Sequence, residues 1–491
     1  MHAKVIVVGA GFAGIGLTRQ LKRAGIEDVV VLERGEDVGG VWRANTYPGC
    51  TCDVPSHLYS FSWAPNPEWT NTFSPQPEIQ AYLRGVAERS DVVRHIRFGV
   101  SFDGAAWDED AQLWRLETSA GPMTAQVLVS AVGPLTEPSF PEVPGIESFR
   151  GTLMHSARWD HEHDLTGERV ASIGTGASAI QYVPEIAPQV DKLLVFQRTA
   201  PWITAHTKRP ITERERRLYR RAPLAQKAVR GAVYTAKELL VLGFVKRPAL
   251  MDVLAKLSKK HLADQVADLT LREQLTPEYS LGCKRIVPSN AWYPALTRDN
   301  VELLPTGLAE VREHSVVGVD GVEHQVDTII FGTGYHVTDI PVAEHLRGRD
   351  GLRLSDHWQG SPRAYLGATV PGFPNLFLML GPNTGLGHSS MVYMIESQID
   401  HVVATIQAMD RAGASAAEVT REVHDAYNRQ VDAKMAGTVW DIGGCRSFYL
   451  DATGRNATLW PDWTWQFRRQ AQRNDPAAYT LTTRQRAGAA R

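Results

Sequence analysis

The chain has 491 residues, of which 43% are hydrophobic and 22% charged, and its formal net charge is -2. This length exceeds what one hydrophobic core usually organises, so two or three domains are expected. The near-neutral charge argues against a general nucleic-acid binder, because no global positive field would attract phosphate backbones. No apolar run reaches the length of about 18 residues that a spanning helix needs, so no stable membrane insertion is expected.

A strand and a glycine-rich turn open the chain. Residues 5–8 form a β-branched run suited to a buried parallel strand, and a helical pattern follows. Between the two stands a G-x-G-x-x-G motif made of Gly9, Gly11 and Gly14. Such a motif alone is weak evidence, because chance would supply it in about a third of chains with this glycine content. The next strand ends at Glu33, where an acid can bind ribose hydroxyls, and this context predicts a dinucleotide site.

The following residues predict further short elements. Residues 76–90 have the pattern of a helix, and residues 95–132 that of short strands with turns at Asp103-Gly104 and Ala120-Gly121. A connector stiffened by four prolines then marks a domain boundary. Because strand-like sequence already begins at Lys4, a signal peptide has no room, and a cytoplasmic location is expected.

A second glycine-rich turn follows the strand at residues 169–173. Its pattern G-x-G-x-x-A predicts cofactor contacts at Gly174, Gly176 and Ser178. The next strand ends in Arg198 and Thr199 instead of an acid. An acid would repel a 2′-phosphate, whereas arginine can bind one, so the site is predicted to prefer NADPH over NADH. The alternative is a surface arginine at a strand end.

Twelve residues, 149–160, lie between the two turns and have the spacing F-x-G-x-x-x-H-x-x-x-W-D, with His155 as the histidine. Two dinucleotide sites in one chain suggest a flavin that takes hydride from a nicotinamide. A stretch between the two sites can respond to the occupancy of both. The simpler alternative is that Phe149 and Trp159 pack under a linker while His155 caps a turn.

Residues 208–275 interrupt this α/β rhythm and predict a helical, locally basic insertion. A membrane or nucleic-acid surface is one interpretation, but a solvated basic face is favoured because the rest of the chain balances the charge. Near the other end, a buried strand at residues 375–380 precedes a helix that starts near Ser389 or Ser390. The polar tail after about Asn474 is expected to fray.

The four cysteines, Cys50, Cys52, Cys283 and Cys445, are few for this length and predict a reducing compartment. The spacing C-x-C of the first two is typical of neither zinc sites nor redox C-x-x-C motifs. We therefore expect ordinary thiols there and no metal site.

The fingerprint at residues 149–160, together with the order of the other motifs along nearly the whole chain, resembles type I Baeyer–Villiger monooxygenases. This resemblance implies an α/β fold with two Rossmann-like dinucleotide-binding domains, for FAD and NADP, and a helical insertion in the NADP domain. The implied division places the FAD domain at 1–140 and 335–491, the latter with a C-terminal closing loop. The NADP domain is implied at 141–207 and 276–334, on either side of the insertion at 208–275.

The resemblance also assigns roles to residues. It implies that FAD occupies the first site, and the residues expected to contact it there are Gly9, Gly11, Gly14, Glu33, Gly40, Trp42, Asp53 and Met391. Lys284 would join Arg198 and Thr199 on the 2′-phosphate. Arg285 would stabilise a peroxide anion, Asp53 would orient Arg285, and His155 would couple NADPH binding to domain closure or serve as a core histidine. Phe448 stands in the loop that covers the nicotinamide, where the family usually has Trp.

The implied reaction uses NADPH and O2 to convert a small-molecule ketone to an ester or lactone through a C4a-peroxyflavin. The alternative is an N- or S-oxygenating flavin monooxygenase, for which a thioether would be a substrate. A flavin disulfide reductase is less favoured, because Cys50 and Cys52 do not form its C-x-x-x-x-C pair. A nucleotide-sensing binding protein without turnover is the remaining class. Nothing in the sequence predicts the oligomeric state.

Overall fold

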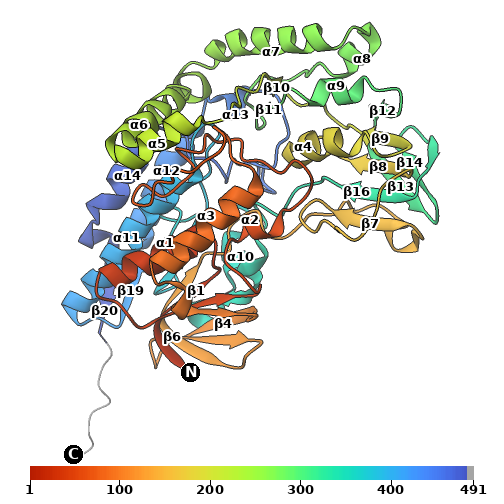
Figure 1. Cartoon of the computed structure of the whole chain (residues 1–491). Coiled ribbons are helices and arrows are strands. Elements are labelled where there is room, and N and C mark those ends of the chain that lie inside the picture. Colours follow the sequence, from red (N-terminus) through yellow and green to blue (C-terminus); the bar gives the residue numbers. More distant parts are fainter. Residues whose placement is uncertain (484–491) are drawn as a thin grey trace, which may run out of the picture.

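The computed structural model describes residues 1–483 and shows two sheets, each covered by helices, with a helical layer across the top in Figure 1. The larger sheet has eight strands in the order β17-β4-β5-β6-β1-β2-β3, with β18 paired to β6. Its strands are β1 (His2–Val8), β2 (Val29–Glu33), β3 (Ile96–Phe98), β4 (Phe102–Asp108), β5 (Leu113–Thr118), β6 (Met123–Ser130), β17 (Leu346–Arg347) and β18 (Leu376–Leu378).

The larger sheet is parallel around β1 and antiparallel at β4-β5-β6. Its central strands are apolar on both faces because helices cover one face and aromatic residues the other. Val5 and Val7 pack with the helices α1 (Phe12–Arg23), α3 (Gln76–Arg89) and α11 (Met391–Ala412). On the opposite face, Ile6 packs with Trp107 and Trp114. The short helix α2 (Val41–Ala44) contacts α3, and α10 (Leu354–Trp358) packs on the second face through Leu354 and Trp358.

The smaller sheet is fully parallel, with five strands in the order β12-β9-β8-β16-β7. They are β7 (Thr152–His155), β8 (Arg169–Ile173), β9 (Lys192–Phe196), β12 (Val301–Leu304) and β16 (Thr328–Phe331). Helices α4 (Ala177–Ile186) and α9 (Trp292–Leu296) pack on it through Tyr182 and Trp292. A three-stranded sheet of β13 (Leu308–Arg312), β14 (Ser315–Gly318) and β15 (Glu323–Gln325) covers its other side. This arrangement confirms the predicted α/β fold.

The chain crosses between the two halves twice, and the two crossings lie side by side. Pro138 and Tyr335 form an antiparallel bridge. The Ser139 N–H donates to the Gly334 carbonyl at 2.9 Å, and the His336 N–H donates to the Glu137 carbonyl at 3.1 Å. Because both crossings share these hydrogen bonds, they form one two-stranded hinge and not two independent linkers.

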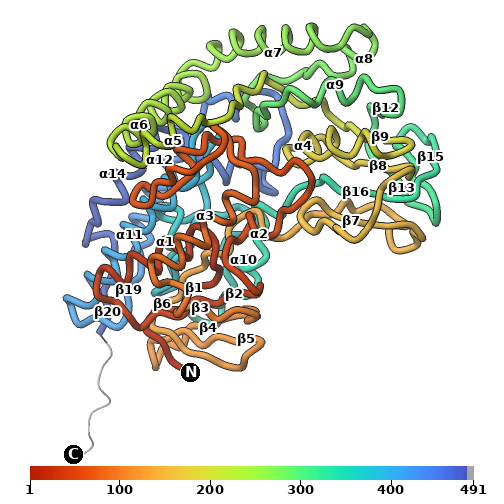
Figure 2. The backbone as a smooth tube through the Cα atoms, in the orientation of Figure 1, coloured from red at the N-terminus to blue at the C-terminus, as the bar shows by residue number. Residues whose placement is uncertain are grey.

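The insertion contains the helices α5 (Glu213–Arg221), α6 (Pro223–Glu238), α7 (Met251–Gln265) and α8 (Leu269–Gln274). In Figure 2 its tube runs along the top of the molecule, over both halves. Many of its cations are solvated and paired: Arg220 contacts Glu68 and Glu213. Arg230 instead donates to the His57 carbonyl at 2.7 Å and fastens α6 to the first half. The ion pairs agree with the predicted solvated face.

Two expectations are wrong. Asp103-Gly104 is not a turn, because β4 runs through it and Gly104 lies at a register shift between β4 and β5. The chain after Asn474 is ordered to Thr482: β20 (Tyr479–Thr482) pairs with β19 (Ala416–Val419), while residues 484–491 lie outside the described part. The predicted start of α11 is confirmed, since the Ser390 side chain accepts from the Val392 N–H and caps the helix.

The remaining elements complete the C-terminal half and the insertion's base. They are α12 (Arg421–Met435), α13 (Val439–Ile442), α14 (Thr464–Arg473), β10 (Ile203–Thr204) and β11 (Val287–Pro288). Within residues 1–483, no helix combines the length and the apolar character that crossing a membrane requires.

Replacing Gly14 by alanine tests the helix–strand contact of the first turn. An added Cβ would lie 1.9 Å from the Gly9 carbonyl oxygen, so the turn must shift. We expect Gly14→Ala to cost about 1–3 kcal/mol, lowering Tm by about 1–2 °C for each kcal/mol in calorimetry. The control is Gly231→Ala in α6, where an added Cβ meets nothing within 4 Å. Alanine favours helices, so the control should keep or raise Tm, and equal melting of the two variants would contradict the prediction.

Candidate active site

The first glycine-rich turn has the geometry of a phosphate-binding cradle. Gly9 has φ of +106°, and a Cβ there would lie 2.7 Å from the Ala131 carbonyl oxygen. A Cβ at Gly40 would lie 3.1 Å from the Cα of Gly11, so the two backbones approach closely and a side chain at Gly40 would crowd the turn. No side chain caps the start of α1. Its first N–H groups are therefore left for an anionic ligand.

Glu33 supports this turn from the end of β2. Only 5% of the residue is exposed, and its carboxylate accepts from the Ala10 N–H at 3.0 Å and from the Gly35 N–H at 2.8 Å. An ionised carboxylate has about four acceptor positions, so it retains capacity for the ribose hydroxyls that the sequence predicted. The structure thus adds a second task for Glu33, which is to hold the glycine turn in shape.

Trp42 and Met391 also belong to the first half. The Trp42 indole N–H donates to the Tyr59 hydroxyl at 2.9 Å, and Gln76 donates to the Trp42 carbonyl. Met391 is the half-buried first residue of α11. The dipole of this 22-residue helix therefore presents its positive end at Met391.

The second glycine-rich turn repeats the first. Gly174 has φ of +102°, and a Cβ there would lie 2.8 Å from the Gly332 carbonyl oxygen. Gly176 has more room, with the same oxygen 3.8 Å from its Cβ position, and Ser178 is half-buried in the first turn of α4. At Gly332 a Cβ would lie 2.9 Å from the Tyr182 hydroxyl. An alanine at position 332 would therefore crowd that hydroxyl.

Two cations converge beside the second turn. Arg198 and Thr199 are exposed after β9, and Lys284 is half-buried with its ammonium 5.0 Å from the centre of the Tyr279 ring. Burial and then the nearby Arg198 charge lower the pKa of Lys284. Within residues 1–483, neither cation forms an ion pair with a carboxylate. Two like charges held together without a counter-ion favour a bound phosphate.

An ion pair between Asp53 and Arg285 joins the two halves of the chain. The Arg285 Nε and Nη2 atoms donate to the two Asp53 carboxylate oxygens at 2.7 and 2.6 Å. The Asp53 charge raises the pKa of Arg285. Burial alone would raise the pKa of Asp53, but the charge and hydrogen bonds of Arg285 outweigh it and lower that pKa. Both groups are therefore ionised at neutral pH, and a third of the Arg285 side chain stays accessible.

Two residues that the sequence did not single out surround this ion pair. Tyr449 is buried, which raises its pKa to about 12, while the charge of Arg285 and a hydrogen bond to it act in the opposite direction. Lys237 comes from α6, and its pKa is lowered by burial while the Asp53 charge acts to raise it. Lys237 is one of many cations in the insertion, so no sequence pattern distinguishes it. Tyr449 directly follows Phe448, so the sequence prediction for the closing loop could have included it.

His155 lies at the hinge, at the end of β7. The residue is 2% exposed, its Nδ1 accepts from the Ala157 N–H at 3.0 Å, and its ring packs on Phe140 and Tyr335. Its Nε2 is buried without a hydrogen-bond partner in the described chain. Burial lowers the pKa of His155 to about 4, so the ring is neutral at neutral pH. This position agrees with a role at the junction of the two halves. It does not agree with a role as a general base beside the Asp53–Arg285 pair.

Gln181 of α4 fastens the second half to the stretch that carries Asp53. Its amide oxygen accepts from the Tyr47 hydroxyl at 3.0 Å and the Thr51 N–H at 3.2 Å, and its amide nitrogen donates to the Thr51 carbonyl at 2.9 Å. Sequence reasoning missed Gln181, because a glutamine in a helix has no signal of its own.

The closing loop, residues 443–456, lies against both halves. Phe448 is 49% exposed, so its ring is available to a ligand or a moving segment. Cys50 and Cys52 are buried free thiols, as predicted. Cys283 and Cys445 instead form a disulfide, which corrects the expectation that all four cysteines are reduced. Their sequence separation of 162 residues gives no local sign of the pairing.

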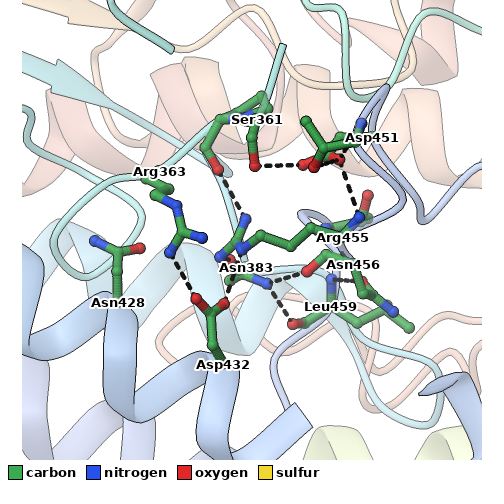
Figure 3. A network of polar contacts seen from close by, with 12 residues as sticks. Ser361, Arg363, Asn383, Asn428, Asp432, Asp451, Arg455, Asn456 and Leu459 are labelled. Carbon is green, nitrogen blue, oxygen red and sulfur yellow. Dashed lines mark hydrogen bonds and ion pairs between the residues drawn. The ribbon is translucent and has the colours of Figure 1, made fainter. Parts of the chain in front are cut away.

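A polar network fixes the far end of the closing loop (Figure 3). Arg455 reaches between two partners, donating to Asp432 at 2.8 Å and to the Asn383 side chain at 2.6 Å. Arg363 contacts the other oxygen of Asp432 at 2.7 Å, and Ser361 donates to Asp451 at 2.7 Å. Burial would raise the pKa of Asp432, but the two arginines lower it, so the network carries ionised groups.

The chain is similar to known flavin-binding monooxygenases along nearly its whole length. A family model described as flavin-binding monooxygenase-like matches residues 2–211. The chain is 48% identical to a Baeyer–Villiger monooxygenase of Streptomyces coelicolor, covering 98% of this chain and 93% of that one. It is 46% identical to one of Pseudomonas aeruginosa, covering 98% and 92%.

A solved structure shares the fold along nearly its whole length. It is the complex of OTEMO with FAD and NADP, which is 27% identical, covers 98% of this chain and 99% of that one, and has a TM-score of 0.88. Together with the two glycine-rich turns and the ion pair between them, these relatives show that the chain belongs to the Baeyer–Villiger monooxygenase family of flavin-binding enzymes.

Proposed function

We propose that this enzyme uses NADPH and O2 to convert small ketones into esters or lactones, with FAD as its bound flavin. The observation that carries the proposal is the ionised Arg285–Asp53 pair, which joins the halves bearing the two glycine-rich turns. The relatives named Baeyer–Villiger monooxygenases favour this reaction over N- or S-oxygenation. The solved structure that binds FAD and NADP supports both cofactors.

The first half would hold FAD. Gly9, Gly11 and Gly14 at the start of α1 would hold its pyrophosphate, and Glu33 would bind its ribose hydroxyls. Gly40, Trp42 and Asp53 come from the same half, and Met391 brings the positive end of α11. We propose the domain division 1–140 with 335–491 for FAD, which is supported by the hinge that pairs Pro138 with Tyr335.

The second half would hold NADPH. Its turn at Gly174, Gly176 and Ser178 opens α4, and Arg198, Thr199 and Lys284 provide the positive charge that a 2′-phosphate needs. The NADP domain would comprise 141–207 and 276–334, on either side of the helical insertion at 208–275. His155, neutral and buried at the hinge, is proposed to couple NADPH binding to the spacing of the halves.

FAD supplies hydride acceptance from NADPH and activation of O2 for transfer of one oxygen atom to the ketone. The side chains around it must stabilise negative charge on oxygen. Arg285 does so as a fixed cation that remains protonated, and Asp53 keeps its guanidinium plane in one orientation through two hydrogen bonds. Because the charge is held in place before reaction, no reorganisation of solvent is required.

Products formed under 18O2 test the reaction class. With NADPH and a panel of linear, cyclic and aryl ketones plus one thioether, we expect an ester or lactone that contains one labelled oxygen. Mass spectrometry identifies the product and its label, and a peroxide assay runs in parallel. Sulfoxide as the only labelled product would overturn the ketone assignment in favour of heteroatom oxygenation.

Removing Arg285 separates cofactor reduction from oxygen transfer. We expect Arg285→Ala to keep flavin and oxidise NADPH, but to form ester about 10²–10³-fold more slowly, with peroxide in its place. Because the variant leaves Asp53 unpaired, Asp53→Asn/Arg285→Ala checks that the loss does not come from a buried charge. Arg312→Ala, which removes a paired arginine from the three-stranded sheet, is the control. Ester formation by Arg285→Ala at the control's rate would exclude the role.

Arg198 is predicted to decide the choice of nicotinamide cofactor. Charge-assisted hydrogen bonds are worth about 1.5–3 kcal/mol, so Arg198→Ala should lower kcat/KM for NADPH by about tenfold to a hundredfold. The value for NADH should change by less than about twofold, since NADH has no 2′-phosphate. Lys192→Ala, at the opposite end of β9 and paired with Glu302, should change neither. An equal loss with both cofactors would show that Arg198 does not read the 2′-phosphate.

A further inference from the structure

The Cys283–Cys445 disulfide connects the site's cationic motif to the closing loop. Cys283 directly precedes Lys284 and Arg285, and Cys445 lies four residues before Tyr449. The Cα atoms of the two cysteines are 6.1 Å apart, within the usual range for a disulfide. The bond therefore ties two segments that both reach the Arg285–Asp53 pair.

The loop backbone lies directly on Cys283. The Ser280 N–H donates to the Gly443 carbonyl at 2.9 Å, and a Cβ at Gly443 would lie 2.7 Å from the Cβ of Cys283. Tyr449 then reaches Arg285 from the same loop. With the Arg455 network at its other end, the loop is fixed at two places, and residues 446–450 stand between them.

We propose that Cys283 and Cys445 form a reversible dithiol–disulfide site, whose oxidation pins the closing loop on the Lys284–Arg285 motif and whose reduction releases it. Cys283 is 1% exposed, whereas Cys445 is half-buried. Each cysteine is followed by a cation, Lys284 or Arg446. The thiolate is the reactive form of cysteine.

The oxidant we assign is a hydroperoxide, with hydrogen peroxide as the simplest member. The Cys445 thiolate attacks one peroxide oxygen, the O–O bond breaks, and the sulfenic acid forms with release of water. The Cys283 sulfur then displaces the second oxygen as water, so two thiols and one H2O2 give one disulfide and two waters. An external dithiol reverses the reaction by thiol–disulfide exchange and is itself oxidised to a disulfide.

Thiol counting and proteolysis of the purified holoenzyme test the site without any turnover. After peroxide treatment, alkylation under denaturing conditions should label only Cys50 and Cys52, and after a phosphine or dithiol reductant all four cysteines. Trypsin reads the loop, because the exposed Arg446 directly follows Cys445. Reduction should speed cleavage after Arg446 by about fivefold or more, since a pinned segment opens less often. Cleavage after the exposed Arg298 is the internal control and should not change.

The variant Cys445→Ser distinguishes the effect of the Cys283–Cys445 disulfide from general effects of the reagents. With peroxide or with reductant, the variant should be cleaved after Arg446 as fast as the wild-type enzyme whose disulfide has been reduced. Its cleavage pattern should not respond to either reagent. Four free thiols in peroxide-treated wild type would overturn the proposal. So would a disulfide whose reduction leaves cleavage after Arg446 unchanged.

The effect on cofactor binding rests on the proposed function. The disulfide holds the closing loop on the segment that contains Lys284 and Arg285. Reduction or Cys445→Ser should therefore raise the apparent KM for NADPH by about threefold or more, while kcat changes less. A redox-insensitive KM with redox-sensitive cleavage would refute control of NADPH binding. Absence of NADPH turnover in every sample would instead count against the proposed function, since the thiol and protease results do not depend on it.

Discussion

The site depends on a short bidentate ion pair between residues that are 232 positions apart, Asp53 and Arg285. Such a contact requires that the two halves meet at one spacing and one angle, because both hydrogen bonds are directional. The other contacts between the halves maintain that spacing. The paired crossings at Pro138 and Tyr335 restrict the hinge, and Gln181 holds the chain just before Asp53. Arg285 is therefore positioned by how the two halves of the chain meet and not by its own loop.

The charge of the molecule is uneven in a way that its net value hides. The whole chain carries a formal charge of -2, yet Lys284 lies near the Arg198 charge and Lys237 lies near the Asp53–Arg285 pair. Among these cations, within residues 1–483, Arg285 alone has a bidentate carboxylate partner. A half-buried cation without a counter-ion, such as Lys284, is costly in the protein alone and becomes favourable when a phosphate binds. The proposed choice of a phosphorylated dinucleotide therefore rests on this local charge and not on the overall balance.

The closing loop links the two kinds of interaction that build the site. At one end a covalent bond holds it to the segment with Lys284 and Arg285. At the other, Arg455 spans Asp432 and Asn383 in a network of ionised and amide groups. Between these anchors the half-exposed Phe448 stands beside the buried Tyr449. One residue of the loop, Tyr449, thus lies at the ion pair while its neighbour Phe448 is half-exposed.

The sequence by itself determined the elements whose cause is local. The two strand–glycine–helix units follow from β-branched runs, steric needs at Gly9 and Gly174, and helical periodicity, all of which act within about ten residues. The start of α11 at Ser390 follows from capping. Only the tertiary structure decided the contacts between distant segments: the Cys283–Cys445 disulfide, the approach of Lys237 and Tyr449 to Arg285, the bulge at Gly104 and the pairing of β20 with β19. These depend on how the intervening chain folds, and no local pattern records which distant partner a side chain or strand edge will meet.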